Sequence, residues 1–357
     1  MRVCRCLRCT DPDSPGLGKS GAQAGDAGSV PAVTGGRRGH GSNRTAWQSD
    51  LVRGDLVKPY RFAYIRPYTV DEAVAALRDG GGGARVLAGG QSLLALMNQR
   101  LLRPSMLVDL ASIPDLRHVT LADGVLRVGA MTTQATVAAG VGAQTWSGFG
   151  LLPESMGLVG HAPIRARGTV GGSIAHADPR AEWCLLAVLL EADVLLQGPA
   201  GVRSVAAGQF FTGTHRTAAG GDEVVVEIRF PRPAPAAALA EFAIQQGNFP
   251  LVAAGVAFDL DADGVVVSAS VALGGVADRP VRAPSAEAAL LGGRADEALF
   301  AHAGQAMARD LDPPGDIHAD PRYRTELAGA MFRRALRMAI SRHPVAGNHG
   351  YDNVEAS

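Results

Sequence analysis

Two short segments with paired glycines, far apart in the sequence, constrain this chain most strongly. Their sequences are Ala88-Gly89-Gly90-Gln91-Ser92 and Thr169-Val170-Gly171-Gly172-Ser173. Glycine lets a backbone lie directly against a ligand, and each segment ends in a serine hydroxyl. Because neither segment fits G-x-G-x-x-G, the pattern predicts an extended polyanionic cofactor held at two loops, in a fold other than the usual dinucleotide-binding one.

The composition is that of a globular protein long enough for two domains. Of the 357 residues 47% are hydrophobic and 19% charged, and the formal net charge is zero. A neutral chain gives no electrostatic basis for binding nucleic acid, and no apolar run is long enough to span a bilayer. Cys4, Cys6 and Cys9 have no second pair at the spacing of a metal site. We therefore expect no metal, no disulfides and a cytoplasmic location.

Residues 1–56 differ from the rest of the chain. From Asp11 to Asp50 the sequence is rich in Gly, Ser, Ala and Arg without periodic apolar residues, which predicts disorder. We hypothesise that Val57, read from a GTG codon, is the true first residue. N-terminal sequencing of the native protein tests this, and a product that retains Cys4 would contradict it. Residues 346–357 are expected to form a loose tail.

The sequence around the first glycine pair predicts a β-α-β-α-β unit. One helix is expected to begin after the cap Thr69, and a second, opened by Ser92, to cover Leu93–Leu101 before Pro104. The glycine pair then lies at a strand-to-helix junction, where backbone N–H groups can receive phosphate oxygens. Taken alone, the pair is equally compatible with a simple tight turn. The three strands are expected at Phe62–Ile65, Arg85–Leu87 and Met106–Leu110.

The residues around both glycine pairs resemble the FAD-binding loops of molybdenum hydroxylase flavoprotein subunits. These are the medium subunits of the carbon monoxide dehydrogenase and xanthine dehydrogenase family. The string VLAGGQSLLALMNQRLLRP, from Val86 to Pro104, is similar to the family's first flavin loop. The string IRARGTVGGSIAHADP, from Ile164 to Pro179, is similar to the second, although Ala166 replaces a usual asparagine. The match continues beyond both strings into the C-terminal third.

The resemblance implies an α+β fold: a two-part FAD-binding domain of the vanillyl-alcohol-oxidase (PCMH) type, then a smaller α/β C-terminal domain of the CO dehydrogenase flavoprotein type. The first is expected over residues 57–231, in subdomains of about 57–111 and 112–231, and the second over residues 232–345. The segment 231–238, rich in Pro and Ala, is typical of a linker. The pattern itself predicts hairpins at Val119–Val128 and Phe258–Ser268, and helices at Glu182–Leu190 and Leu327–Ile340.

The resemblance implies FAD contacts in both strings and at a few positions beyond them. Thr169 and Ser173 can donate hydrogen bonds to phosphate or ribityl oxygens. Asp178 and Glu182 suit the hydroxyls of a cofactor, because carboxylates repel phosphate. Val225 is equally well explained as a core strand residue. The expected contacts are Leu87, Ala88, Gly89, Gly90, Gln91, Ser92, Val159, Thr169, Val170, Gly171, Gly172, Ser173, Asp178, Glu182, Val225 and Phe249.

Two further features bear on the chemistry of the site. His176 is either a general base or a neutral imidazole bonded locally, and we favour the second. Residues 244–250 depart from the family: 244–246 replace basic residues, Asn248 an acid and Pro250 an alanine. Since the resemblance places Phe249 near the reactive face of the flavin, we expect altered electrostatics there. The alternative is loss of a surface ion pair at little cost.

Together these expectations describe the FAD-binding electron-transfer subunit of a heterotrimeric molybdenum hydroxylase, an oxidoreductase. The chain contains no G-x-S-x-G, no H-E-x-x-H and no four-cysteine cluster motif, so no catalytic residue is assigned to it. The resemblance implies [2Fe–2S] clusters on a small partner subunit and a molybdopterin cofactor on a large one, in a dimer of heterotrimers. Electrons would leave for NAD, quinone or oxygen. The alternatives are a free-standing flavin oxidase and a flavin-free scaffold subunit.

Overall fold

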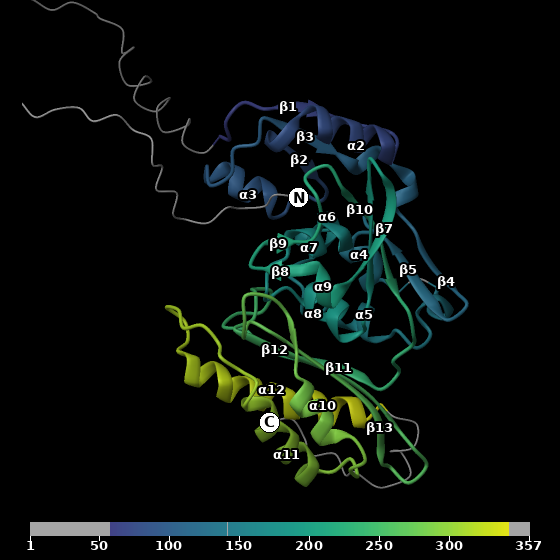
Figure 1. Ribbon diagram of the computed structural model, residues 1–357, viewed down its shortest axis with the longest axis vertical. Helices are drawn as coiled ribbons and strands as arrows, with labels where there is room; N and C mark the ends of the chain where they lie inside the picture. Colours follow the sequence, from purple (N-terminus) through teal and green to yellow (C-terminus); the bar gives the residue numbers. More distant parts are fainter. Residues whose placement is uncertain (1–57, 141, 343–357) are drawn as a thin grey trace, which may run out of the picture.

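The computed structural model describes residues 58–140 and 142–342, in which three larger sheets follow one another along the long axis and a two-stranded sheet accompanies the middle one (Figure 1). We divide the described chain into three units, each built on one of these larger sheets. They are the first unit (residues 58–117), the second unit (118–235) and the third unit (236–342). The predicted extension over residues 1–56, Val57, and the tail over 346–357 lie outside the described residues. No helix in the described ranges is both long and apolar enough to cross a membrane.

The first unit is a small parallel sheet covered by one helix. Its elements are β1 (Ala63–Ile65), α2 (Val70–Asp79), β2 (Ala84–Leu87), α3 (Leu93–Asn98) and β3 (Met106–Asp109). The strands lie in the order β1-β3-β2, all parallel, which confirms the predicted β-α-β-α-β unit. The Thr69 hydroxyl accepts a hydrogen bond from the Glu72 N–H (3.2 Å) and caps α2. Val74 and Leu77 on the inner face of this helix are buried.

Helix α3 is shorter than predicted. It ends at Asn98 instead of Leu101 because Arg100 takes a left-handed conformation, with φ of 59°. The N–H of Leu101 then donates to the Leu96 carbonyl (2.9 Å), an ending that turns the chain out of the helix. A left-handed arginine has no sequence signal, since such residues are usually glycine or asparagine.

The second unit is built on a five-stranded antiparallel sheet. Its strands are β4 (Val119–Ala122), β5 (Val125–Gly129), β6 (Asp193–Gly198), β7 (Gly201–Ala206) and β10 (Val224–Phe230), with a small pair β8 (Phe211–Gly213) and β9 (Arg216–Thr217). The helices are α4 (Gln134–Ala138), α5 (Leu151–Ser155), α6 (Ala162–Arg167), α7 (Val170–His176), α8 (Glu182–Leu189) and α9 (Ala207–Phe210). The strand order is β4-β5-β10-β6-β7. Asp123 and Gly124 form the predicted β4–β5 turn, and α8 is buried along its whole length.

The second glycine pair is not in a loop, contrary to the prediction. Gly171 and Gly172 lie in the first turn of α7. Paired glycines disfavour a helix, but the Thr169 hydroxyl accepts a hydrogen bond from the Gly172 N–H (3.1 Å) and caps it. The helix ends at His176, and the next residue, Ala177, is left-handed with φ of 52°.

The third unit is an antiparallel sheet with three helices on one face (Figure 1). Its strands are β11 (Ala237–Phe242), β12 (Val252–Leu260), β13 (Val266–Gly274) and β14 (Val281–Arg282), in that order. Its helices are α10 (Pro284–Leu290), α11 (Glu297–Ala308) and α12 (Pro321–Ile340). The linker expected over 231–238 ends earlier, because Ala237 already pairs with Ala257. Helix α12 begins six residues before the predicted Leu327, at a cap formed by Asp320.

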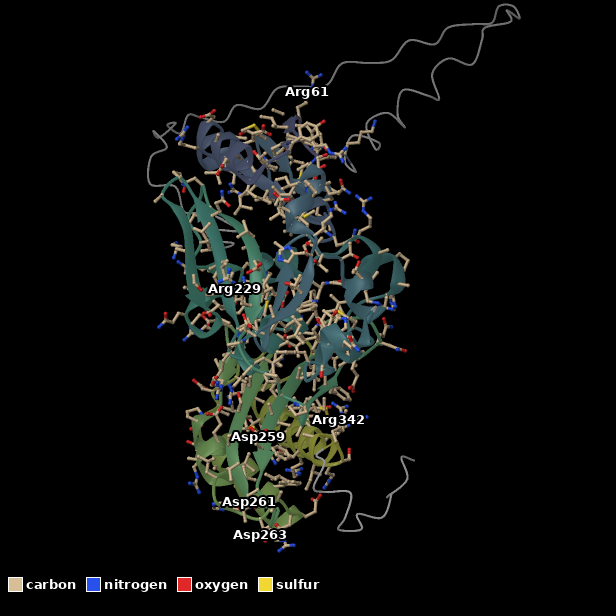
Figure 2. The ribbon with its side chains drawn as sticks, turned by 90° about the vertical axis from the view of Figure 1, so that its right-hand side faces the viewer. Arg61, Arg229, Asp259, Asp261, Asp263 and Arg342 are labelled. Atoms are coloured by element: carbon tan, nitrogen blue, oxygen red, sulfur yellow. The ribbon has the colours of Figure 1, made fainter. Side chains whose placement is uncertain are left out.

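The predicted β12–β13 hairpin lies at the end of the molecule opposite the first unit. Figure 2 shows Asp259, Asp261 and Asp263 there, far from Arg61 at the other end. Asp261 accepts hydrogen bonds from the N–H groups of Asp263 and Val265 (both 2.9 Å), so its carboxylate stabilises the turn.

One buried cation holds the third unit together next to the place where the three units meet. Arg324 of α12 is only 3% exposed. Its guanidinium donates to the carbonyls of Leu251 (2.7 Å) and Gly275 (3.1 Å) and to the carboxylate of Asp316 (2.6 Å). The helix thereby fixes the start of β12 and the end of β13 at the same point.

We expect Arg324→Leu to lower the free energy of unfolding by about 2–4 kcal/mol, because two buried carbonyls lose their donor. Arg322→Leu is the matched control: Arg322 lies on the same helix with a side chain that is 90% exposed, and it is paired with Glu326. That change is expected to cost less than about 1 kcal/mol. Urea unfolding measures both variants, and equal losses would show that Arg324 has no special role.

Candidate functional site

A cavity of about 570 Å³ lies where the three units meet. That volume is within the range of about 300–1,000 Å³ found for ligand sites. The first unit contributes the loop between β2 and α3, and the second unit contributes residues of α6, α7 and the start of α8. The third unit contributes residues between Ile244 and Leu251, together with His318. A ligand in this cavity would therefore contact all three units.

The two glycine pairs approach each other at the wall of the cavity. A side chain on Gly89 would overlap the carbonyl oxygen of Arg167, and a Cβ on Gly172 would come within 3.3 Å of the Ala88 Cβ. Gly90 is left-handed, with φ of 75°. The glycines thus allow two backbone segments to touch, a role that the sequence analysis did not assign to them.

Most of the predicted contact residues line the cavity. Whether they contact a cofactor stays a prediction, but their placement is compatible with it. They come from both glycine-containing segments, from α8 and from the third unit: Ala88, Gly89, Gly90, Gln91, Ser92, Val159, Thr169, Gly172, Ser173, Glu182 and Phe249.

The other five predicted residues, Leu87, Val170, Gly171, Asp178 and Val225, are not among those that line the cavity. Val170 is fully buried in the core, and Gly171 lies so close to Ala130 that a side chain would overlap it. Gly171 and Val225 instead border a separate cavity of about 20 Å³. Asp178 is 4% exposed and is paired with Arg180.

Several lining residues were missed by the sequence analysis. Gln134 is buried against Gly168, and its Oε1 has no hydrogen-bond partner among the described residues. Arg180 follows the last residue of the second string and lies between Asp178 and Glu182, so its position could have indicated it. Gln134 carries no comparable signal, because only the packing of α4 against α6 brings it to the site. The remaining lining residues that were missed include Gly160, Ile164, Ala175, Asn248 and His318.

Arg180 connects the second unit to the third at the cavity wall. Its Nε lies 3.2 Å from Oδ1 of Asp178, and its second terminal nitrogen lies 3.3 Å from Oδ2. The guanidinium carbon is 5.2 Å from the centroid of the Phe249 ring, within the range of a cation–π contact. A positive charge is therefore held beside Phe249, next to the segment that lacks the family's usual basic residues.

Two acidic side chains near the cavity lack cationic partners in the described structure. Burial, together with the nearby charge of Asp178, raises the pKa of Glu182 to about 7. Burial, followed by the charge of Glu182, raises the pKa of Glu241 in β11 to about 8. Oε2 of Glu241 has no hydrogen-bond partner among the described residues. Both carboxyls therefore hold a proton well above the pH at which exposed glutamates lose it.

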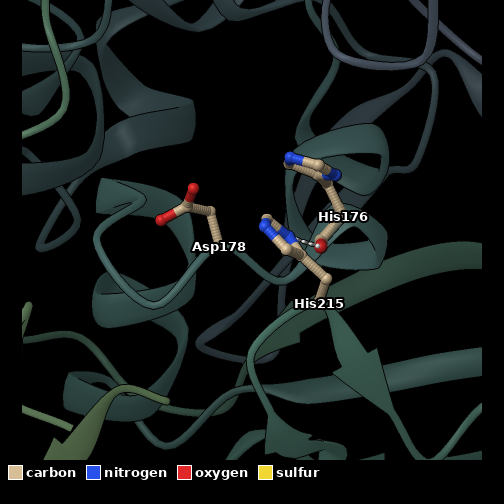
Figure 3. Close-up of side chains that lie close together, drawn as sticks. All are labelled: His176, Asp178 and His215. Carbon is tan, nitrogen blue, oxygen red and sulfur yellow. Dashed lines mark hydrogen bonds between the residues drawn. The ribbon is translucent and has the colours of Figure 1, made fainter. Parts of the chain in front are cut away.

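His176 is the lining residue for which two roles were considered. Burial, followed by the proximity of His215, lowers its pKa to about 4, so the imidazole is neutral at pH 7 as expected. The two rings have centroids 4.5 Å apart, and Figure 3 shows them together with Asp178. The hydrogen bond within this pair joins Nδ1 of His215 to the backbone carbonyl of His176 (3.0 Å). The local bond is thus made by the main chain of His176 and not by its ring.

The chain matches known proteins over most of its length. A model of the FAD binding domain in molybdopterin dehydrogenase matches residues 60–233, and one of the CO dehydrogenase flavoprotein C-terminal domain matches residues 237–339. The carbon monoxide dehydrogenase medium chain of Hydrogenophaga pseudoflava is 35% identical, over 80% of this chain and 99% of that protein. The xanthine dehydrogenase FAD-binding subunit of Escherichia coli O157:H7 is 25% identical, over 78% of this chain and 96% of that protein.

Among solved structures, quinoline 2-oxidoreductase from Pseudomonas putida 86 aligns with a TM-score of 0.76 at 36% identity, over 80% of this chain and 99% of that one. Carbon monoxide dehydrogenase from Hydrogenophaga pseudoflava gives the same values. These matches confirm the predicted α+β fold, with an FAD-binding domain followed by a CO dehydrogenase flavoprotein C-terminal domain.

We expect Gly89→Ala to lower the free energy of unfolding by about 1–3 kcal/mol, because the new methyl group would overlap the Arg167 carbonyl and force the segments apart. Gly82→Ala is the matched control, since a Cβ there meets no atom within 4 Å. Thermal or urea unfolding of both proteins checks the difference. Equal stability of the two variants would mean that the segments do not touch in solution.

The raised pKa of Glu182 makes stability depend on pH. The folded protein holds a proton there that the unfolded chain releases near pH 4.5, so stability should fall as the pH rises from about 4.5 to about 7. The loss is on the order of 3 kcal/mol. Glu182→Gln should flatten this dependence, whereas Glu326→Gln, at an exposed position on α12, should not. Urea unfolding at pH 5 and pH 8 measures the slopes, and unchanged slopes in Glu182→Gln would contradict the assignment.

Proposed function

The chain belongs to the FAD-binding subunits of the molybdopterin dehydrogenases, and we propose that it is the electron-transfer subunit of a molybdenum hydroxylase. In this proposal [2Fe–2S] clusters on a small partner subunit deliver electrons, and a large molybdopterin subunit oxidises the substrate. FAD supplies the chemistry on this chain, since it accepts and releases electrons singly or in pairs. The observation that carries the proposal is a single cavity lined by both glycine-containing segments, in a chain that covers almost the whole of a CO dehydrogenase medium chain.

The residues that line the cavity fit FAD. The close approach of Gly89 and Gly172 to neighbouring atoms leaves backbone and hydroxyl groups, with no bulky side chain, at the centre of the wall, where a pyrophosphate could lie. The unpaired Oε1 of Gln134 is a buried acceptor that a ribityl or ribose hydroxyl would satisfy. Ser92 and Ser173 offer hydroxyl donors along the same wall.

A charged side chain of the second unit lies beside Phe249 of the third unit. Phe249, the residue expected beside the reactive face of the flavin, is 45% exposed and carries the Arg180 guanidinium over its ring. We propose that Arg180 supplies the positive charge that residues 244–246 lack. Glu182, with a pKa of about 7, is partly protonated at neutral pH, and its protonated carboxyl can donate as well as accept a hydrogen bond in the cavity.

The chain would function within a larger complex. The complex would be a heterotrimer, assembled as a dimer of heterotrimers in the cytoplasm, that passes electrons to NAD, a quinone or oxygen. The substrate would be set by the large subunit and not by this chain.

Co-expression with the two partner subunits tests this assignment. We expect the purified complex to contain one FAD per copy of this chain, and the substrate of the complex to reduce that FAD in stopped-flow absorbance measurements. The isolated chain should bind FAD but should not oxidise the substrate. Turnover by the isolated chain would favour a free-standing oxidase, and a colourless complex would favour a flavin-free scaffold; either result would overturn the proposal.

A further inference from the structure

Three side chains with metal-binding atoms converge beside the FAD cavity. His176 is the last residue of α7, Asp178 follows two residues later, and His215 lies in the turn between β8 and β9 (Figure 3). One ligand atom from each lies within 4.8 Å of the other two. His176 also lines the cavity. The sequence gives no sign of this cluster, because His215 lies 39 positions from His176 and only the fold brings them together.

The ring of His215 is oriented as a metal ligand requires. Its Nδ1 lies 3.0 Å from the carbonyl oxygen of His176, an atom that can only accept, so Nδ1 carries the hydrogen. Nε2 of the neutral ring then has a free lone pair. Metal-binding histidines in proteins are commonly fixed in this way, by a hydrogen bond from the second ring nitrogen to a carbonyl or carboxylate.

The backbone beside these three residues is left-handed at two positions that contact each other. Ala177 has φ of 52° and His215 has φ of 53°, although neither is glycine. The N–H of His215 donates to the carbonyl of Ala177 (2.9 Å), so the two left-handed residues are in direct contact. Such conformations are costly for residues other than glycine, and they cluster at ligand sites. Here they hold His176, Asp178 and His215 on adjoining segments.

We propose that His176, Asp178 and His215 bind a divalent transition-metal ion of the Zn²⁺ class. Two imidazoles and one carboxylate are a ligand set that Zn²⁺ accepts, whereas Mg²⁺ and Ca²⁺ prefer oxygen ligands. Tetrahedral Zn²⁺ with bonds of about 2.1 Å places its ligands roughly 3.4 Å apart. The present separations are up to 4.8 Å, so metal binding requires the side chains to rotate toward one another. Three protein ligands leave the fourth position for water or another small ligand.

Arg180 competes with the metal for Asp178. Both carboxylate oxygens of Asp178 lie within 3.3 Å of guanidinium nitrogens of Arg180. Metal binding must therefore displace at least part of this ion pair, and the positive charge of Arg180 also repels the metal. Removal of the guanidinium should strengthen the site, an effect opposite in sign to removal of a ligand. Because Arg180 also contacts Phe249, metal binding would also change the position of the positive charge beside Phe249 in the cavity.

The test is a Zn²⁺ titration of the full chain, without a purification tag, against a chromophoric chelator. Cys4, Cys6 and Cys9 are replaced by Ser in every protein, because their thiols could bind Zn²⁺ independently. His176→Asn, Asp178→Asn and His215→Asn remove one ligand each, and asparagine tolerates the left-handed backbone at position 215. His302→Asn, at an exposed position in α11, is the matched control. Unfolding temperatures show which variants are folded.

We expect one Zn²⁺ per chain in the starting protein and in His302→Asn. Each ligand variant should bind at least about tenfold more weakly, as loss of ligand-shell interactions does in other sites. Arg180→Met should bind more tightly than the starting protein, which keeps the proposal testable even if a ligand variant fails to fold. A tenfold excess of Mg²⁺ should not compete. Absence of saturable Zn²⁺ binding, equal affinity in folded ligand variants, or weaker binding in Arg180→Met would each overturn the proposal.

Discussion

The site depends on direct contact between two backbone segments that carry the glycine pairs. Gly89 of the first unit lies against the carbonyl of Arg167 at the end of α6, and Gly171 of α7 lies against Ala130 beside the central sheet, so a side chain on either glycine would overlap its neighbour. Backbone atoms have no rotamers, and contacts between them define the wall of a cavity more rigidly than contacts between long side chains can. The same contact brings the hydroxyls of Ser92 and Ser173 to one cavity.

Much of the fold could be predicted because its signals are local. The cap Thr69 and the turn Asp123-Gly124 each act over a few residues, and the structure has both as expected. The second glycine pair misled the prediction, because paired glycines usually mark a loop, whereas the hydroxyl of Thr169 stabilises a helix start there. The early end of α3 at Asn98 depends on a left-handed arginine, which no residue pattern indicates.

The candidate site was predictable mainly where it follows the two strings, together with a few positions that the family resemblance adds, such as Glu182 and Phe249. Residues such as Gln91 and Ser173 belong to those strings and line the cavity. Gln134 and His318 reach it through packing between elements far apart in the sequence, which a resemblance between short strings does not encode. Asp178 shows the opposite case: it belongs to the second string, but its carboxylate is paired with Arg180 and is not among the groups that line the cavity, so its contact with a cofactor stays a prediction.

The position of the cavity at the junction of all three units has a thermodynamic consequence. A ligand that contacts all three units binds only when the units are packed together. Its binding free energy therefore adds to the free energy of packing between the units. Loading of the cofactor and consolidation of the tertiary structure are then one linked equilibrium. The protein without its cofactor is in this sense a looser molecule than its holo form, and the prosthetic group acts as a structural element of the chain that binds it.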